Sequence, residues 1–291
     1  MYVAGLDIGS TMTKVVIMEK ESILASIVGP TGAEHRRLAN RVMADALSRA
    51  KLSFDDIAYV VATGYGRVSV PFADWQITEI SCHAKGISSI FPTARTVIDI
   101  GGQDCKGIKL SGGKACLDVG KVVDFVMNDK CAAGTGRFLE VIAEALQVPL
   151  EKMGELSLKA KGKVRISNTC TVFAEQEVVS HLAEGANTAD IVAGLHDAIA
   201  SRIHNMVERI GIERDVVVTG GGAKNIGLIR ALEGKIGENI LVPPEPLLTG
   251  ALGAALLCRK RAEKAKKEGS LPRRERRLEE VHFFTYPESG V

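Results

Sequence analysis

Three glycine-rich loops carry the residues whose chemistry is easiest to assign in this sequence. The first loop, DIGSTMTK, follows a short apolar run and offers hydroxyl groups and a positive charge at Ser10, Thr11, Thr13 and Lys14. Gly9 permits a tight turn, so that backbone N–H groups of the loop can converge. Such a set of donors can surround phosphate oxygens. We therefore predict a phosphate site at this loop.

A second loop, DIGGQD, repeats the opening of the first. Gly101 and Gly102 leave their N–H groups unhindered, and the amide of Gln103 can orient a water molecule for in-line attack on a phosphoryl group. Asp7 and Asp99 end the two preceding apolar runs, where a carboxylate can hold Mg²⁺ through water. The repeated Asp-Ile-Gly also predicts two related domains that face each other across a cleft.

The third loop, TGGGAKN, follows the apolar run DVVV. Gly220, Gly221 and Gly222 would let a nucleotide approach the backbone closely. The sequence contains neither a GxxxxGK[ST] loop nor a dinucleotide-binding fingerprint. One glycine-rich turn is weak evidence, but three in this order, each leaving an apolar run, predict a nucleotide site.

Two of the six cysteines precede predicted helices. Cys131 lies in NDKCAAGTGRFLEV, and Cys170 lies in SNTCTVFAEQEV. A helix N-terminus carries partial positive charge and unpaired N–H groups, which stabilise anionic sulfur and suit an iron–sulfur cluster. Two thiolates per chain cannot complete a four-thiolate set, so a cluster at these positions would need a two-fold dimer. The residues alone also leave open a buried structural role, which is common for free cysteines.

The remaining cysteines and the helical histidines are expected to have no chemical role. Neighbouring side chains seldom point at each other, which argues against a nucleophile pair formed by Cys82 and His83. Four cysteines are expected to be structural: Cys82, Cys105, Cys116 and Cys258. Three histidines are expected at the surface or as capping residues of helices: His181, His196 and His204.

Alternating strands and helices are expected to position the loops. Apolar runs predict a β-hairpin over residues 1–20 and strands that end at Gly64, at Gly101 and before Gly220. Helical spacing of apolar residues predicts helices at 35–50, 137–146, 172–185 and 189–211. This order is typical of α/β proteins.

The composition is that of a soluble globular protein. The chain has 291 residues, of which 46% are hydrophobic and 25% charged, and its formal net charge is +2. This balance gives no reason to expect a nucleic acid or a membrane as partner, and no apolar stretch approaches the ~18 residues of a spanning helix. The first residues lack the basic start of a signal peptide, so we expect a cytoplasmic protein whose thiols are free or metal-bound.

The chain changes character near residue 259. From there to residue 280, Lys and Arg outnumber Glu and apolar residues are scarce. This composition favours a solvated helix end followed by a partly disordered segment. A docking arm for an acidic partner surface is the alternative.

Seven segments together resemble the activator component of 2-hydroxyacyl-CoA dehydratases and the related ATPase subunits of benzoyl-CoA reductase. They are LDIGSTMTK, ATGYGR, SCHAKG, VIDIGGQD, MNDKCAAGTGRFLE, SNTCTVFAEQEV and VTGGGAKN. The trio of loops resembles the wider actin, Hsp70 and sugar-kinase superfamily. The resemblance runs from about residue 3 to about residue 258, and its two cysteine-containing blocks are specific to this group among actin-like ATPases.

The resemblance implies an α/β fold of two ribonuclease-H-like domains with an ATP cleft between them. We expect domain I at 1–94, domain II with the cluster-binding helices at 95–258, and a basic C-terminal helix and tail at 259–291. ATP or ADP, with Mg²⁺, would be bound by Ser10, Thr11, Met12, Thr13, Lys14, Gly101, Gly102, Gln103, Gly220, Gly221 and Lys224. Lys224 departs from the Gln that members of the group often carry there. Asp7, Asp99 and Gln103 would support hydrolysis.

The resemblance also implies a homodimer with one [4Fe–4S] cluster, held by Cys131 and Cys170 of each chain. The implied function is ATP-dependent one-electron transfer from a ferredoxin or flavodoxin to a dehydratase or reductase that itself contains an iron–sulfur centre. The residues leave two alternatives open. One is a small-molecule kinase of the same superfamily without a cluster, and the other is a nucleotide-dependent scaffold of actin or chaperone type. Neither explains two cysteines at helix starts beside nucleotide loops.

Overall fold

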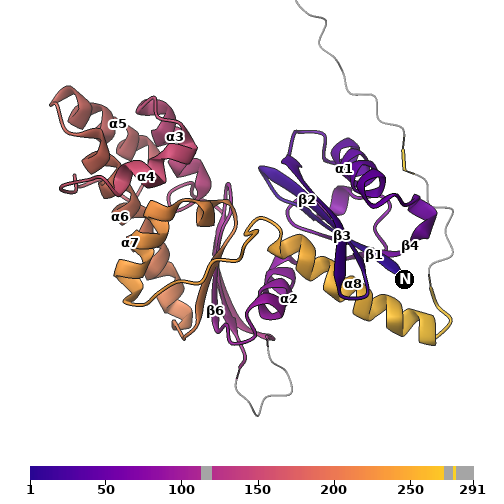
Figure 1. Ribbon diagram of the computed structural model, residues 1–291. Helices are drawn as coiled ribbons and strands as arrows, with labels where there is room; N and C mark the ends of the chain where they lie inside the picture. The colour runs from indigo at the N-terminus through magenta and orange to yellow at the C-terminus, as the bar shows by residue number, and fades with distance from the viewer. Residues whose placement is uncertain (113–119, 272–277, 280–291) are drawn as a thin grey trace, which may run out of the picture. The chain divides into compact units, whose positions relative to one another are not determined.

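The computed structural model describes residues 1–112, 120–271 and 278–279. The chain forms two compact units, each built on its own sheet (Figure 1). Unit 1 consists of residues 1–82 and 250–291, and unit 2 consists of residues 83–249. The mixed α/β architecture predicted from the sequence is therefore confirmed.

Unit 1 is built on a five-stranded sheet with the order β3-β2-β1-β4-β5. β1 (Tyr2–Ile8) and β2 (Met12–Glu19) form the predicted antiparallel hairpin, which β3 (Ser22–Pro30) extends. β4 (Ile57–Thr63) lies parallel to β1, and β5 (Trp75–Gln76) lies parallel to β4. β1 is central and almost wholly buried, which explains why it has a continuous apolar run rather than an alternating pattern.

Helix α1 (His35–Ala50) packs against β2 and β3 of this sheet. Its buried apolar side chains recur at helical spacing: Ala39, Val42, Met43, Ala46 and Leu47. The helix ends where Lys51 adopts a left-handed backbone conformation, with φ of 57°. The helix predicted at 35–50 is confirmed.

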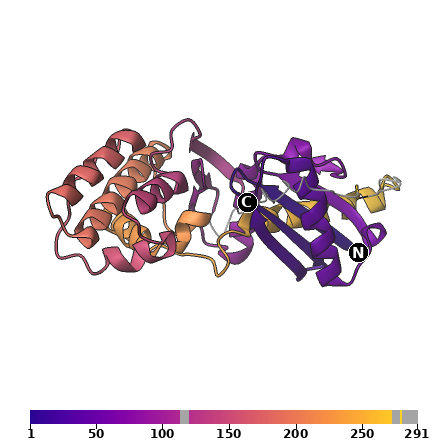
Figure 2. The same ribbon diagram turned by 90° about the horizontal axis from the view of Figure 1, so that it is seen from above.

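Helix α8 (Thr249–Lys267) belongs to unit 1 from Gly250 onward. It runs along the strands of unit 1 in both views (Figures 1 and 2). A side chain at Gly5 of β1 would collide with the backbone of Ala251 and Ala255, so this close approach requires glycine. Near its other end, the guanidinium of Arg261 stacks 4.3 Å from the centre of the Trp75 ring.

The two units divide the chain differently from the expected segments 1–94, 95–258 and 259–291. The divisions fall after Cys82 and after Thr249. The change in composition at residue 259 lies inside α8, because the small apolar residues that pack this helix continue as far as Ala262 while its basic residues face outward. A charge run thus marks the exposed part of one helix and not a domain boundary.

Unit 2 is built on a four-stranded sheet with the order β8-β7-β6-β9. β6 (Thr96–Ile100) and β7 (Cys105–Leu110) form an antiparallel hairpin, and β8 (Val122–Asn128) extends it as an edge strand. β9 (Val216–Thr219) lies parallel to β6. Both strands predicted in this region are confirmed.

The helices of unit 2 gather beside this sheet in Figures 1 and 2. They are α3 (Gly136–Ala145), α4 (Met153–Ser157), α5 (Thr171–Ala183), α6 (Thr188–Val207) and α7 (Ile226–Ile236). The core of unit 2 joins β6 and β9 to the buried faces of these helices. Helix α2 (Glu79–Ile90) begins in unit 1 and continues in unit 2. The predicted helices correspond to α3, α5 and α6.

Some elements were not predicted, namely β3, β5, β7, β8, α2, α4 and α7. Among the helices of the described ranges, none combines the length and apolarity needed to cross a membrane.

Candidate functional site

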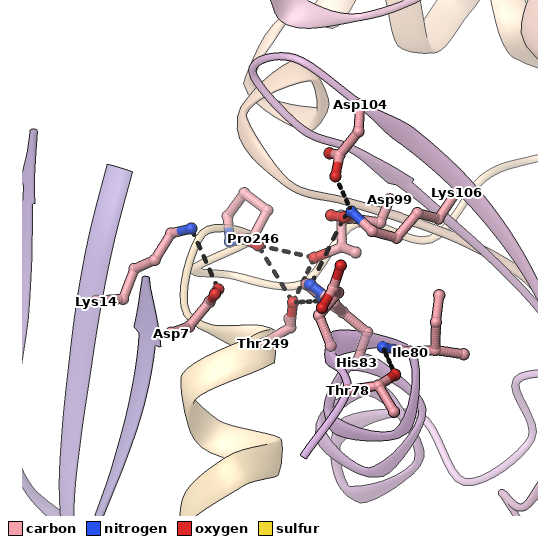
Figure 3. Close-up of polar contacts among 12 residues, drawn as sticks. Asp7, Lys14, Thr78, Ile80, His83, Asp99, Asp104, Lys106, Pro246 and Thr249 are labelled. Carbon is pink, nitrogen blue, oxygen red and sulfur yellow. Dashed lines mark hydrogen bonds and ion pairs between the residues drawn. The ribbon is translucent and has the colours of Figure 1, made fainter. Parts of the chain in front are cut away.

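The turn between β1 and β2 brings Asp7 and Lys14 together. The two residues lie opposite each other in the hairpin, and Lys14 Nζ is 3.2 Å from Asp7 Oδ2 (Figure 3). The Gly9 N–H donates to the Met12 carbonyl at 3.1 Å and closes the turn. Both charged side chains are largely buried, so each is the main compensation for the charge of the other.

The hydroxyls predicted in this loop do not all point the same way. Ser10 and Thr11 are half-buried at the turn. Thr13 is fully buried, and its Oγ1 lies 2.8 Å from Thr31 Oγ1. The donors available at the turn are therefore the backbone, the Ser10 and Thr11 hydroxyls and the Lys14 ammonium.

The second loop repeats this arrangement in unit 2 and adds further groups (Figure 3). Lys106 Nζ lies 3.3 Å from Asp99 Oδ2 and 2.7 Å from Asp104 Oδ2. His83 Nε2 is 3.5 Å from the same Asp99 oxygen, and His83 Nδ1 is 3.0 Å from Thr249 Oγ1. Asp99, Lys106 and His83 are all buried. Asp99 is thus the centre of a polar cluster with Lys106 and His83. Of these three residues, only Asp99 was predicted from the sequence to belong to the site.

The carbonyl groups of this loop hold the start of α3. The Gly136 N–H donates to the Gly101 carbonyl at 2.8 Å, and the Arg137 N–H donates to the Gly102 carbonyl at 2.7 Å. These donors belong to the first turn of α3, whose N–H groups have no partner within the helix. The adjacent Gln103 is exposed. A shift of the second loop therefore pulls directly on α3.

The third loop passes closely over the Asp99 carboxylate. Gly220 has a positive φ of 82°, and a Cβ there would lie 2.5 Å from the Ile100 carbonyl oxygen and 2.6 Å from Asp99 Oδ1. Only glycine fits this position without displacing one of those groups. Gly221–Lys224 then form a short 3₁₀ turn, with the Lys224 side chain exposed.

His196 is buried beneath the third loop, so the expectation that it lies at the surface or caps a helix is wrong. Its Nε2 lies 3.0 Å from Asn225 Nδ2, and Asn225 in turn caps α7 by accepting from the Leu228 N–H at 3.0 Å. Burial lowers the pKa of His196 to about 4, so the ring is neutral near pH 7 and Nε2 can accept. One signal was available, because His196 falls at helical spacing with the inward-facing residues Val192 and Ile199 of α6.

Cys131 and Cys170 come together at one place in unit 2. Cys131 Sγ lies 3.9 Å from the carbonyl oxygen of Thr169, the residue that precedes Cys170. Cys170 is the N-cap of α5, as predicted. Cys131 does not directly precede a helix, because α3 begins only at Gly136. Instead, Asn128 Nδ2 holds the intervening turn by donating to the carbonyls of Cys131 and Ala133 at 2.8 and 3.0 Å.

Arg202 of α6 lies between the two cysteine loops. Its Nη1 donates to the Asn168 carbonyl at 2.9 Å, two residues before Cys170. Its Cδ lies close beneath Gly134, at 3.2 Å from the position of a Cβ there, three residues after Cys131. Arg202 therefore joins both cysteine loops and places a positive charge near them. Sequence patterns gave no hint of this role, because an arginine in a long helix is usually solvated.

Exposed apolar side chains flank the cysteines. On edge strand β8 they are Val123, Phe125 and Met127, and on α5 they are Val172, Phe173 and Val179. Phe173, only three residues after Cys170, is 60% exposed. Large exposed apolar side chains are typical of surfaces that are covered in an assembly where they form one patch.

Three other cysteines have the structural character that was expected. Cys82, Cys105 and Cys258 are buried, and none of them forms a disulfide. Burial raises the pKa of the Cys82 thiol to about 12, and burial likewise raises the pKa of Cys105. A neutral buried thiol is a poor nucleophile. Cys116 lies outside the described residues.

The residues at the two loops and at the cysteines fit the groups that were predicted from the sequence, a nucleotide with Mg²⁺ and an iron–sulfur cluster. Two loops each combine a buried carboxylate with a lysine, which suits a phosphate chain with Mg²⁺. Both free thiols at the cysteine loops are accessible, and the Thr171 hydroxyl beside them has no partner among the described residues. Within those residues, no group of three His, Cys, Asp or Glu side chains could hold a metal.

Comparison with known proteins identifies relatives along most of the chain. Residues 4–258 match the BadF/BadG/BcrA/BcrD ATPase family. A 2-hydroxyisocaproyl-CoA dehydratase activator from Clostridioides difficile is 48% identical over 92% of this chain and 98% of its own length. The (R)-2-hydroxyglutaryl-CoA dehydratase activating ATPase from Acidaminococcus fermentans is 46% identical over 91% of this chain and 99% of its own length.

Solved structures of similar fold include one of the same activators. The activator of the 2-hydroxyisocaproyl-CoA dehydratase from Clostridium difficile with bound ADPNP superposes with a TM-score of 0.85, covering 92% of this chain and 98% of that chain at 48% identity. A ROK family glucokinase from Streptomyces griseus has a TM-score of 0.54 at 14% identity and covers 89% of this chain and all of its own. The second likeness concerns the fold alone.

Proposed function

This chain belongs to the BadF/BadG/BcrA/BcrD ATPase family, and we propose that it is the ATP-hydrolysing activator of a 2-hydroxyacyl-CoA dehydratase or of a related reductase. Two copies of the chain would share one [4Fe–4S] cluster. Single electrons would pass from a ferredoxin or flavodoxin, through the cluster, to the iron–sulfur centre of the partner enzyme. The proposed setting is the cytoplasm, without nucleic acid or membrane as partner. The names of the relatives support the class of partner.

In this proposal the three loops bind ATP and Mg²⁺. The Ser10–Lys14 turn, the Gly101–Gln103 turn and the Gly220–Lys224 turn supply backbone donors and ammonium groups to the nucleotide. The carboxylates of Asp7 and Asp99 hold Mg²⁺ through water. Gln103 orients a water molecule whose oxygen attacks the γ-phosphorus, so that the bond to the bridging oxygen breaks and ADP and phosphate are formed.

The observation that carries the proposal is the short path from the second loop to both thiols. The first turn of α3 is hydrogen-bonded to the second loop, because the N–H groups of Gly136 and Arg137 donate to its carbonyls. The chain segment that leads into this turn begins at Cys131. The Cys131 sulfur contacts the carbonyl of Thr169 beside Cys170. Hydrolysis that moves the second loop would therefore move the cysteine region, as a switch between two arrangements requires.

Cys131 and Cys170 of two chains would be the four ligands of the cluster. The chemistry supplied by the bound cluster is a one-electron relay, in which the donor is oxidised by one electron and the partner is reduced by one. The chain supplies the Arg202 charge near the site and the exposed apolar side chains of β8 and α5 around it. Burying those side chains against a second copy would keep water away from the thiolates.

Anaerobic purification of cysteine variants tests the proposal. The wild-type protein should be brown and contain about four iron atoms per dimer, since four thiolates complete one cluster. Cys131→Ser and Cys170→Ser should abolish the bound iron. Cys105→Ala is the matched control, because it removes a buried thiol from the same unit and should retain iron.

Activity provides the second part of the test. With a reduced donor and the partner dehydratase, electron delivery should require both ATP and the two cysteines. A colourless wild-type protein with normal ATP turnover would refute the electron-transfer role and leave an ATPase with another output. Iron that survives both serine substitutions would refute the ligand assignment.

A further inference from the structure

The two hairpins that carry the first and second loops are alike residue by residue. In both, an Asp lies opposite the Lys seven positions later: Asp7 faces Lys14, and Asp99 faces Lys106. The same atoms, Lys Nζ and Asp Oδ2, are 3.2 Å apart in the first hairpin and 3.3 Å apart in the second. The turns also close alike, by a glycine N–H that donates to the carbonyl of the residue three positions later.

The neighbouring parallel strands extend this match. Asp7 is paired with Thr63 of β4, and Asp99 is paired with Thr219 of β9. Each threonine is followed by a glycine with positive φ, Gly64 at 84° and Gly220 at 82°. A Cβ on either glycine would lie within 2.6 Å of Oδ1 of the paired aspartate. The carboxylate of each loop is therefore fixed in the same orientation, and Lys106 occupies in unit 2 the place that Lys14 occupies in unit 1.

The second hairpin differs from the first in its charges. The position of Met12 in the first turn is occupied by Asp104 in the second, and its carboxylate lies 2.7 Å from Lys106 Nζ. Two carboxylates thus share the Lys106 ammonium. Asp99 has a side chain only 5% exposed, whereas that of Asp104 is 28% exposed at the turn.

This difference decides which of the two contacts an anion can replace. Taking the ammonium away from a buried carboxylate costs more than taking it from a partly exposed one, so Asp99 keeps the lysine. A partly exposed carboxylate can be hydrated instead, so Asp104 can release it. An incoming phosphate group would therefore compete with Asp104 and not with Asp99.

We propose that Lys106 is a second phosphate-binding lysine, which Asp104 holds in the absence of nucleotide and which turns to the γ-phosphate of ATP. The inference rests on the nucleotide function proposed above and assigns it a residue that discriminates ATP from ADP. ADP lacks the γ-phosphate, so with ADP the ammonium stays on Asp104. Because Gly101 and Gly102 of the same turn hold α3, this exchange would report the γ-phosphate to the cysteine region.

Binding of Mg²⁺ with ADP and with the non-hydrolysable analogue ADPNP, measured by calorimetry, tests this role. Lys106→Gln should weaken ADPNP binding about tenfold or more, as expected for loss of a charged hydrogen bond, and should leave ADP binding within about threefold. Lys109→Gln is the matched control, because it removes another ion pair of β7, to Glu213 at 2.8 Å, away from the turn. It should change neither affinity.

Asp104→Asn provides a variant that keeps the buried pair of Lys106 with Asp99 and so protects the fold. It frees the ammonium and should strengthen ADPNP binding relative to ADP, but not when Lys106→Gln is also present. Equal weakening of both nucleotides by Lys106→Gln, or no shift of the ratio in Asp104→Asn, would overturn the inference and leave the nucleotide function intact. A wild-type chain that binds neither nucleotide would overturn both.

Discussion

Substituting Gly220 by alanine tests how the third loop and the Asp99 carboxylate fit together. Gly220 combines a φ of 82° with a ψ of −175°, a backbone region almost confined to glycine, and this conformation costs an alanine roughly 1–3 kcal/mol. The new methyl group would also lie 2.5 Å from the Ile100 carbonyl oxygen and 2.6 Å from Asp99 Oδ1. Overpacking of this kind costs a further ~1–3 kcal/mol. We expect Gly220→Ala to lower the free energy of unfolding by roughly 2–6 kcal/mol and to displace Asp99.

Gly237→Ala is a control for positive φ alone, because Gly237 has a φ of 80° in the left-handed helical region, with ψ of 16°, and would place its Cβ in open space. It should cost only about 1 kcal/mol. Urea unfolding should be followed by far-UV circular dichroism, since the single tryptophan, Trp75, lies in unit 1 and does not report on unit 2. ATP turnover should fall in Gly220→Ala and persist in Gly237→Ala. Equal, small destabilisation in both variants with normal turnover would refute the close fit.

Three further predictions concern the groups behind the loops. Burial lowers the pKa of His196 from 6.5 to about 4, so between these pH values only the unfolded chain takes up the proton. The free energy of unfolding should therefore fall by roughly 3 kcal/mol as the pH is lowered from about 6.5 to about 4. Urea unfolding measures this loss, which should be smaller in His196→Gln. Arg202→Ala should speed the loss of iron to a chelator about tenfold, because residues that hold the loops of metal ligands commonly affect metal binding by this much. Substitution of the exposed Arg209 by alanine should not change the rate of iron loss. Gly136→Pro removes the N–H that donates to the Gly101 carbonyl and places the proline ring against that carbonyl, so it should displace the second loop and lower both ATP turnover and ATP-dependent partner reduction, the latter at least about fivefold. Thr188→Pro, at the same position of α6, should leave both rates unchanged.

The loops were predictable because each stands where an apolar run stops at glycine, a signal confined to adjacent residues. The strand ends before Gly64, Gly101 and Gly220 followed from it. The helix at 35–50 followed from a second local signal, the helical spacing of its apolar residues. The place of Cys170 at the start of α5 could be predicted for the same reason. In each case the local pattern and the folded structure depend on the same neighbours.

The rest of the site depends on residues that only the fold brings together. Lys106 looks like an ordinary strand lysine until the hairpin register places it opposite Asp99. Arg202 and His196 lie on one long helix, and their partners come from loops far away in the sequence. The contact of Cys131 with Thr169 is of the same kind. The change in composition at residue 259 lies within α8, because a charge run can follow the exposed side of a helix whose other side is packed.

Electron paramagnetic resonance of the dithionite-reduced, air-free protein tests whether the bound nucleotide changes the environment of a cluster held by Cys131 and Cys170. Spectra would be recorded with Mg²⁺ and either ADP or ADPNP. We expect the signal of one reduced [4Fe–4S] cluster per two chains, with a line shape that differs between the two nucleotides. The signal should be absent from Cys170→Ser. A reduced protein without this signal, or with identical spectra for both nucleotides, would contradict the proposed function.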